Sequence, residues 1–173
     1  VFDLEASKER LLTTLAEPEF FQGAPAWSPD GTTIAASMLQ PAPDLETTLA
    51  VLYHSLKEDF GVPHVACRLW GKVPEQSYLP ELAATSQELR DYADQLGAPH
   101  CGPAAPFESR DWFDAGADCR SFAFLPLRTA YTFGLLGLGD ENAERFHSGM
   151  GTVYLTRLAE LASVATSRYL PPV

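Results

Sequence analysis

The pattern of apolar and polar positions begins with a predicted helix over residues 3 to 16. Leucines recur there at about the helical spacing, with charged residues between them, and Pro18 ends the run. The next stretch, residues 22 to 43, is rich in proline and contains a turn signal. We expect this stretch to be a connector with a short helix around residues 34 to 39.

A stronger helical pattern starts at Asp44. An aspartate is a good N-cap, because its carboxylate accepts hydrogen bonds from the free amides of the first turn. Apolar residues then recur on one face as far as Phe60, and Gly61 supplies a stop. Residues 79 to 96 are likewise predicted to be helical, ending before Gly97.

Three short apolar runs predict strands. They are residues 65–70 (VACRLW), 121–127 (SFAFLPL) and 133–138 (FGLLGL). The second and third runs are separated by a short turn, so we expect an antiparallel hairpin. Pro126 lies inside the second run and indicates an edge position or a bulge, because proline cannot donate a ladder hydrogen bond.

The remaining segments predict one loop and one long helix. Residues 99 to 118 are rich in proline and acidic residues, which is typical of a loop. Asp140 is placed to cap a short helical turn that runs to Phe146. The last helix is predicted from about residue 148 to 169, and its wide apolar arc favours packing on two partners: its own sheet and a second subunit.

Together these elements predict an α+β fold. A few antiparallel strands, with helices at both ends of the chain, are expected to form a sheet covered by helices. We divide the chain into a helical arm with its proline-rich connector, residues 1–43, and a domain, residues 44–173.

Four segments carry a resemblance to a known family. They are residues 58–62 (EDFGV), 121–128 (SFAFLPLR), 133–139 (FGLLGLG) and 145–152 (RFHSGMGT). The chain thereby resembles the bacterial domain-of-unknown-function family 484 over about residues 44–170, most closely in the C-terminal block. The resemblance implies a GAF-like domain: a central antiparallel sheet with the N- and C-terminal helices on one face, and loops or short helices on the other. It also implies a sensory or regulatory module without assigned catalytic residues.

Charge and cysteine content narrow the function classes. The net charge of -11 disfavours nucleic acid and anionic membrane surfaces as partners, because both carry negative charge. No apolar run approaches the ~20 residues that span a bilayer. The first ten residues are charged and lack a signal-peptide core. Cys67, Cys101 and Cys119 are widely spaced and odd in number, so we expect reduced thiols in the cytoplasm.

The chemistry-bearing residues form no catalytic or metal motif in sequence. The four histidines, His54, His64, His100 and His147, are scattered, and no paired Cys or His spacing fits zinc. Cys101 beside His100 is the one conceivable nucleophile, because an imidazole can lower a thiol pKa. We therefore predict no catalytic residue, no metal ligand and no identifiable cofactor.

The glycines of residues 134–139 do not form a phosphate-binding loop. They lack the Lys-Ser/Thr end of a P-loop and the strand-then-helix context of a dinucleotide motif. Glycines in a strand allow another group to approach the backbone closely. We expect that group to be a packed helix, with a ligand as the alternative.

Strand alternation places one set of side chains on the sheet face away from the terminal helices. This set combines aromatic and cationic side chains, which suits the wall of a ligand-binding cleft. We expect the loop at Cys101 and Gly102 to cover that cleft. The predicted ligand-binding residues are Arg68, Trp70, Cys101, Gly102, Phe122, Phe124 and Arg128. The alternative interpretation is that the two phenylalanines fill a second small core and that Arg68 is solvated.

The leading functional hypothesis is a non-enzymatic sensory or regulatory GAF-like module. It would bind an unidentified small molecule and form a homodimer through its terminal helices. The alternative is a protein-interaction scaffold without a small ligand, marked by an exposed apolar patch on Leu4, Leu11, Leu155 and Ala159. An enzyme would require a perturbed Cys101 or His100 inside a cleft.

Overall fold

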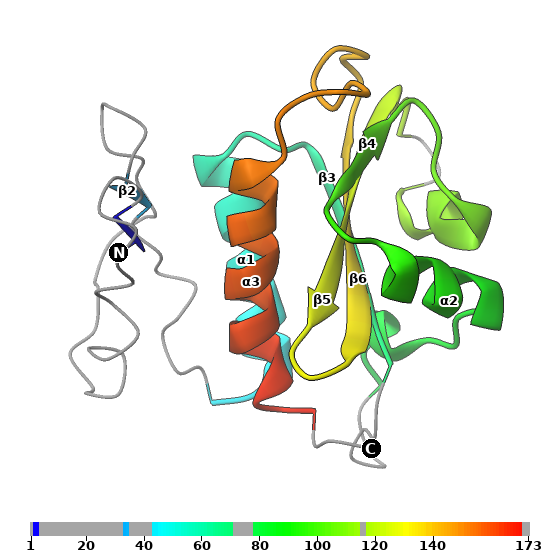
Figure 1. Ribbon diagram of the computed structural model, residues 1–173. Helices are drawn as coiled ribbons and strands as arrows, with labels where there is room; N and C mark the ends of the chain where they lie inside the picture. The colour runs from blue at the N-terminus through cyan, green and yellow to red at the C-terminus, as the bar shows by residue number, and fades with distance from the viewer. Residues whose placement is uncertain (1, 4–32, 35–42, 71–77, 115–116, 171–173) are drawn as a thin grey trace.

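The computed structural model describes residues 2–3, 33–34, 43–70, 78–114 and 117–170. A four-stranded antiparallel sheet lies between two layers of helices (Figure 1), so the predicted α+β class is confirmed. The strand order is β3-β6-β5-β4. The strand bounds are His64–Leu69 for β3, His100–Gly102 for β4, Ser121–Arg128 for β5 and Thr132–Asp140 for β6.

The two helical layers divide the apolar residues into two cores. Helices α1 (Leu45–His54) and α3 (Val153–Ser167) cover one face of the sheet, and α2 (Gln87–Gln95) lies on the other (Figure 1). Alternation along the strands sends Cys67 and Leu125 into the first core, and Ala66 and Phe124 into the second. The predicted assignment of strand faces is confirmed.

The start and end of the first helix agree with the sequence. The Asp44 carboxylate accepts the Thr47 amide at 2.7 Å, which is the expected N-cap. After α1 the chain continues as a π-helical turn, η3 (Ser55–Asp59). Gly61 then adopts φ +60°, a left-handed conformation that ends the helix at little steric cost.

The predicted helix over residues 79–96 is wrong in its first half. The chain forms a short 3-10 turn, η4 (Pro80–Leu82), and α2 begins after Ser86. The Ser86 amide donates to Glu108 Oε1 at 2.8 Å, and its hydroxyl donates to Oε2 at 2.9 Å. A distant carboxylate thus holds Ser86 outside the helix, where its side chain caps α2.

The predicted loop at residues 99–118 is also wrong in part. It contains strand β4 and the 3-10 helix η5 (Phe107–Trp112). The β4 sequence, His-Cys-Gly, has no apolar pattern of its own. It becomes a strand by pairing with β5, with His100 opposite Phe124.

The last helix starts later than predicted. α3 begins at Val153 after Thr152, not at Ser148, because Gly149 has φ +88° and breaks any helix there. The expected cap at Asp140 is a strand end instead. This residue closes β6, and its Oδ1 accepts the Asn142 amide at 2.7 Å in the following turn.

Near the N-terminus, β1 (Phe2–Asp3) pairs antiparallel with β2 (Thr33–Ile34). Asp3 and Ile34 therefore lie in strands rather than at the ends of the helices predicted over residues 3–16 and 34–39. The remainder of both predicted helices lies outside the described residues. The domain boundary at residue 43 stays a prediction.

Three glycines of β6 admit neighbouring atoms rather than a packed helix. A Cβ on Gly137 would lie 3.0 Å from the Phe113 ring, and one on Gly139 would lie 2.9 Å from the Cys119 sulfur. A Cβ on Gly134 would lie 2.9 Å from the backbone oxygen of Arg68. We expected a helix to pack against these glycines, and this expectation is wrong. Residues of the second core and strand β3 occupy the space beside them.

Gly134→Ala should destabilise the protein by about 1–3 kcal/mol, because the new methyl group meets backbone that cannot rotate away. Gly151→Ala is the control, since a Cβ there meets nothing within 4 Å, and we expect a change within about 0.5 kcal/mol. Urea unfolding followed by circular dichroism measures both. Equal stabilities for the two variants would contradict the close approach of β3 to β6.

Candidate functional site

The predicted pocket over the sheet is filled by its own aromatic residues. Phe122 and Phe124 are 1% and 0% exposed, and their rings stack with centroids 6.2 Å apart. Phe113 closes the group, 5.5 Å from Phe122. Arg110 lies over the outer ring, 5.1 Å from the Phe122 centroid. The alternative interpretation, that these two phenylalanines fill a second core, is therefore correct.

Arg68 and Trp70 are half-buried beside this core and contact protein side chains. The Arg68 guanidinium lies 5.1 Å from the Trp112 ring centroid, and Arg90 lies 5.9 Å from that of Trp70. The Trp70 indole donates to the Thr132 carbonyl at 3.1 Å. The structure therefore accounts for both residues by packing.

Cys101 and Gly102 lie in β4 and are buried. The Ser148 hydroxyl approaches the Cys101 carbonyl at 3.4 Å and covers this end of the strand. Burial raises the pKa of the Cys101 thiol, and burial likewise raises the pKa of Cys67 and of Cys119. A raised pKa leaves little thiolate at neutral pH, which is the opposite of an activated nucleophile.

Arg128, the last of the predicted residues, lines a cavity of about 260 Å³. The cavity lies between one stripe of α3, the loop that leads into β4, and the end of β5. Its lining residues are Gly97, Ala98, Pro99, Pro126, Arg128, Thr156, Ala159, Glu160 and Ser163.

Two prolines explain why the sheet opens at this point. β4 and β5 pair only as far as His100 opposite Phe124. Continuing that register would place Pro99 opposite Leu125 and Ala98 opposite Pro126, yet neither proline has an amide to donate. The strands separate here, and β5 is shifted in register between Leu127 and Arg128. Pro126 therefore has no β4 partner on that side, which confirms the predicted edge position, whereas the irregularity in pairing with β6 falls after Leu127.

Arg128 contacts both helical layers. Its backbone amide donates to the Ser163 hydroxyl of α3 at 2.9 Å. Its Nη2 donates to the Ala93 carbonyl near the end of α2 at 2.8 Å. Its Nε is buried and has no hydrogen-bond partner within the described part of the chain.

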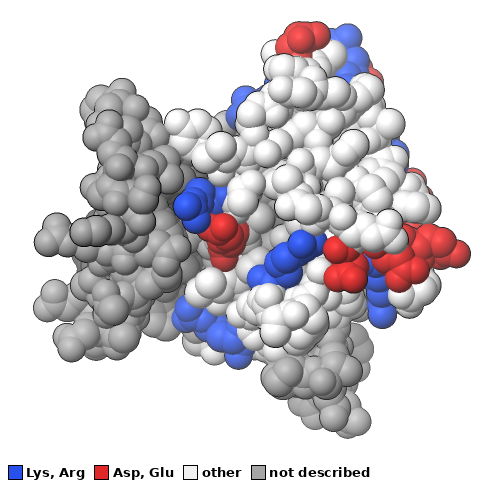
Figure 2. Space-filling model, viewed as in Figure 1, with Lys and Arg blue, Asp and Glu red and all other residues white. Residues whose placement is uncertain are grey.

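No carboxylate in the described part of the chain forms an ion pair with Arg128. Ion pairs among the described residues join His64 with Glu141, Arg145 with Asp140, and Arg157 with Glu160, and none involves Arg128. Acidic side chains gather over α2, and basic side chains lie between them and α3 on the face shown in Figure 2. The cavity wall therefore carries a cation whose counter-charge the described residues do not supply.

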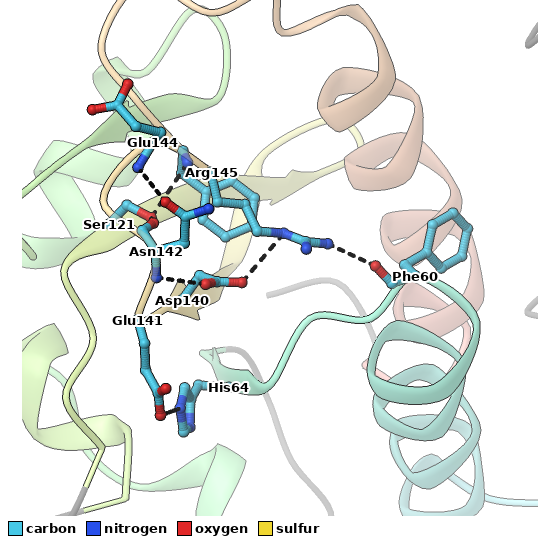
Figure 3. A network of polar contacts seen from close by, with 9 residues as sticks. Phe60, His64, Ser121, Asp140, Glu141, Asn142, Glu144 and Arg145 are labelled. Atoms are coloured by element: carbon cyan, nitrogen blue, oxygen red, sulfur yellow. Dashed lines mark hydrogen bonds and ion pairs between the residues drawn. The ribbon is translucent and has the colours of Figure 1, made fainter.

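A second polar cluster lies at the opposite end of β6, where side chains bond to one another and to backbone carbonyls (Figure 3). Asp140 Oδ2 lies 3.4 Å from Arg145 Nε. Arg145 Nη2 donates to the Phe60 carbonyl at 2.7 Å, and the Ser121 hydroxyl donates to the Asn142 carbonyl at 2.7 Å. These bonds join the turn after β6 to β5 and to the exit of η3, so the cluster is explained by structure.

The described ranges contain no group of three or more His, Cys, Asp or Glu side chains placed to hold a metal ion. No helix described here is both long enough and apolar enough to cross a bilayer.

The exposed apolar patch predicted on the terminal helices differs from the one in the structure. Ala159 is 6% exposed and packs in the first core, so its assignment to an exposed patch is wrong. Leu155 is half-buried, and Leu4 and Leu11 lie outside the described residues. The exposed apolar residues of α3 are Val153, Tyr154 and Val164.

No protein-family model matches the sequence, and no curated protein matches it. The GAF-like assignment drawn from the four sequence segments therefore stays a proposal. The observed fold, an antiparallel sheet with α1 and α3 on one face, is compatible with it.

Most of the residues that line the cavity were not predicted from the sequence. Thr156, Ala159, Glu160 and Ser163 follow the i, i+3, i+4, i+7 spacing of one helix stripe, so their shared face was available from periodicity. The sequence contains no signal for the residues opposite them, because the β4–β5 register decides where the strands separate.

Ser163→Ala should destabilise the protein by about 1–3 kcal/mol, because it leaves the Arg128 amide without its acceptor. Ser167→Ala, one turn later on α3, removes a hydroxyl with a 3.4 Å exposed contact and should change stability by no more than about 0.5 kcal/mol. Thermal and urea unfolding test the pair. A neutral Ser163→Ala would show that the bond to Arg128 does not hold α3 on β5.

The native thiols should react with iodoacetamide about tenfold or more slowly than a free cysteine at mildly alkaline pH. The raised pKa of Cys101 keeps the thiol protonated, and all three cysteines are buried. Mass spectrometry of timed samples measures the rate, with guanidinium-unfolded protein as the fully reactive control. Rapid native labelling of Cys101 would contradict this and would revive a nucleophilic role.

Proposed function

We propose that this protein is a non-enzymatic sensory or regulatory module that binds a small molecule in the cavity between α3, the 97–99 loop and the end of β5. The observation that carries the proposal is the Arg128 side chain, which lines this cavity without a carboxylate partner among the described residues. Ligand sites combine apolar walls with a few fixed polar groups, and this cavity has that composition.

The volume of the cavity supports a small ligand. At about 260 Å³ the cavity lies just under the range of about 300–1,000 Å³ typical of drug-sized ligands. Alanine and proline side chains form much of the wall, and the Thr156 and Ser163 hydroxyls add polar atoms on the α3 side. A metabolite of amino-acid size fits this volume.

Three further features support binding rather than catalysis, in a GAF-like module of the cytoplasm. The four segments resembling the GAF-like family include β5 and β6. The buried thiols have raised pKa values, which disfavours cysteine chemistry. All three cysteines are free, as expected in a reducing compartment.

A protein-interaction scaffold is the alternative, and one observation favours it. Val153, Tyr154 and Val164 of α3 are 63%, 47% and 43% exposed, which is unusual for apolar side chains along one helix. These residues would serve the proposed homodimer through the terminal helices. The cavity is lined by other residues of the same helix, so the two functions can be tested by separate mutations.

Ala98→Trp should block the cavity, because Ala98 is exposed and lines it. The control is Ala84→Trp, which adds the same ring at an exposed position that does not line the cavity. A library of neutral, cationic and anionic metabolites is tested against both by thermal shift and by amide NMR. We expect binders whose affinity falls at least about tenfold in Ala98→Trp and is retained in the control.

Two outcomes would reject the proposed site. One is that no library member shifts the amide resonances of Ala98, Arg128 or Ser163. The other is that the hits bind Ala98→Trp as tightly as the control variant, which would place their site elsewhere.

A further inference from the structure

We propose that the ligand of this cavity is a small monocarboxylate with a short aliphatic tail, bound through the Arg128 guanidinium. This inference rests on the proposed function and specifies its ligand class. It is drawn from the donor set of the cavity, the charges around it and the nature of its walls.

The donor geometry favours a carboxylate. A guanidinium presents its N–H groups in a planar fork that matches two carboxylate oxygens. One terminal nitrogen of Arg128 is occupied by the Ala93 carbonyl at 2.8 Å, whereas Nε is buried and unpartnered among the described residues. Nε is shielded from solvent in this structure, so a ligand carboxylate reaches it when the Arg128 side chain turns toward the cavity. Pairing then removes the cost of a buried donor without an acceptor.

The nearby charges favour a single negative charge on the guest. Arg128 supplies one cation that has no ion-paired carboxylate among the described residues, and Glu160 lines the same cavity with a negative charge. The Glu160 carboxylate is paired with Arg157 at 2.7 Å, so it is not left to bind an ammonium group. A second anionic group on the guest would meet Glu160, which disfavours phosphate and dicarboxylates.

The remaining wall favours an aliphatic tail. Ala98, Pro99, Pro126 and Ala159 present apolar surface on three sides of the cavity, from the loop, β5 and α3. Burial of a short alkyl chain there removes apolar surface from water, which favours binding. The size of the cavity limits the chain to a few carbons.

The test compares guests of one shape and three charges. Butyrate, butanamide and butylamine are titrated into the full chain, with inorganic phosphate as a non-carboxylate anion, and amide NMR reports the affinity. We expect butyrate to shift the resonances of Ala98, Arg128 and Ser163 and to bind at least about tenfold more tightly than the other three.

Variants at Arg128 identify the group responsible. Arg128→Gln should weaken butyrate binding about tenfold or more, and Arg128→Lys should weaken it less, because it keeps the charge but loses the fork. Arg168→Gln is the charge-matched control, at an exposed position that does not line the cavity, and should bind as the wild type does. Circular dichroism establishes that each variant is folded.

The outcomes separate the two proposals. If butanamide or butylamine binds the cavity as well as butyrate does, the carboxylate inference is wrong while the ligand site stands. Equal butyrate affinity in Arg128→Gln and Arg168→Gln also rejects the inference. If phosphate binds most tightly, the site recognises anions but not carboxylates. If none of these probes or the metabolite library perturbs the cavity, the proposed function fails as well.

Discussion

Burial of the β5–β6 hairpin on both faces is the constraint on which the rest of the structure depends. Every residue of β5 from Ser121 to Leu127 is buried, and β6 is buried from Phe133 to Asp140. Such strands need a covering layer on each side, because neither face can be left to water. α1 and α3 supply one layer, and α2 with Phe113 supplies the other. The aromatic residues that resembled a cleft wall are therefore committed to the second layer.

The same constraint explains why the candidate site lies at an edge. When both faces of a sheet are covered by packed side chains, a ligand finds space only where the hydrogen-bond pairing between strands is interrupted. Pro99 and Pro126 end the β4–β5 pairing, and Arg128 lies two residues beyond Pro126, where β5 has no β4 residue paired beside it. The cavity thus lies where two prolines, which lack amide hydrogens, interrupt the pairing of the strands. Arg128 lines it as a polar residue.

The success of sequence-based prediction followed how local each signal was. Asp44, Gly61 and the alternation of β3 and β5 act through neighbours in the chain, and these predictions are confirmed. Strand β4 and the late start of α2 depend on partners more than twenty residues away, at Phe124 and Glu108, and no periodicity reports them. Of the predicted site residues, Arg128 alone lines the cavity. Trp70, Phe122 and Phe124 were predicted on the correct face, but their packing could not be seen from pattern. Cys101 was predicted on the wrong face: it pairs opposite Ala123 and packs in the first core, on the side of α1 and α3.

The double attachment of Arg128 has a consequence for how occupancy would be transmitted. Its amide is held by α3 and its guanidinium by the last turn of α2, on opposite sides of the sheet. Anything that draws the guanidinium toward the cavity competes with the Ala93 carbonyl, while the attachment to Ser163 is unaffected. The event would loosen the carboxyl end of α2 and leave α3 in place, so hydrogen exchange would quicken on the face of the molecule remote from the terminal helices.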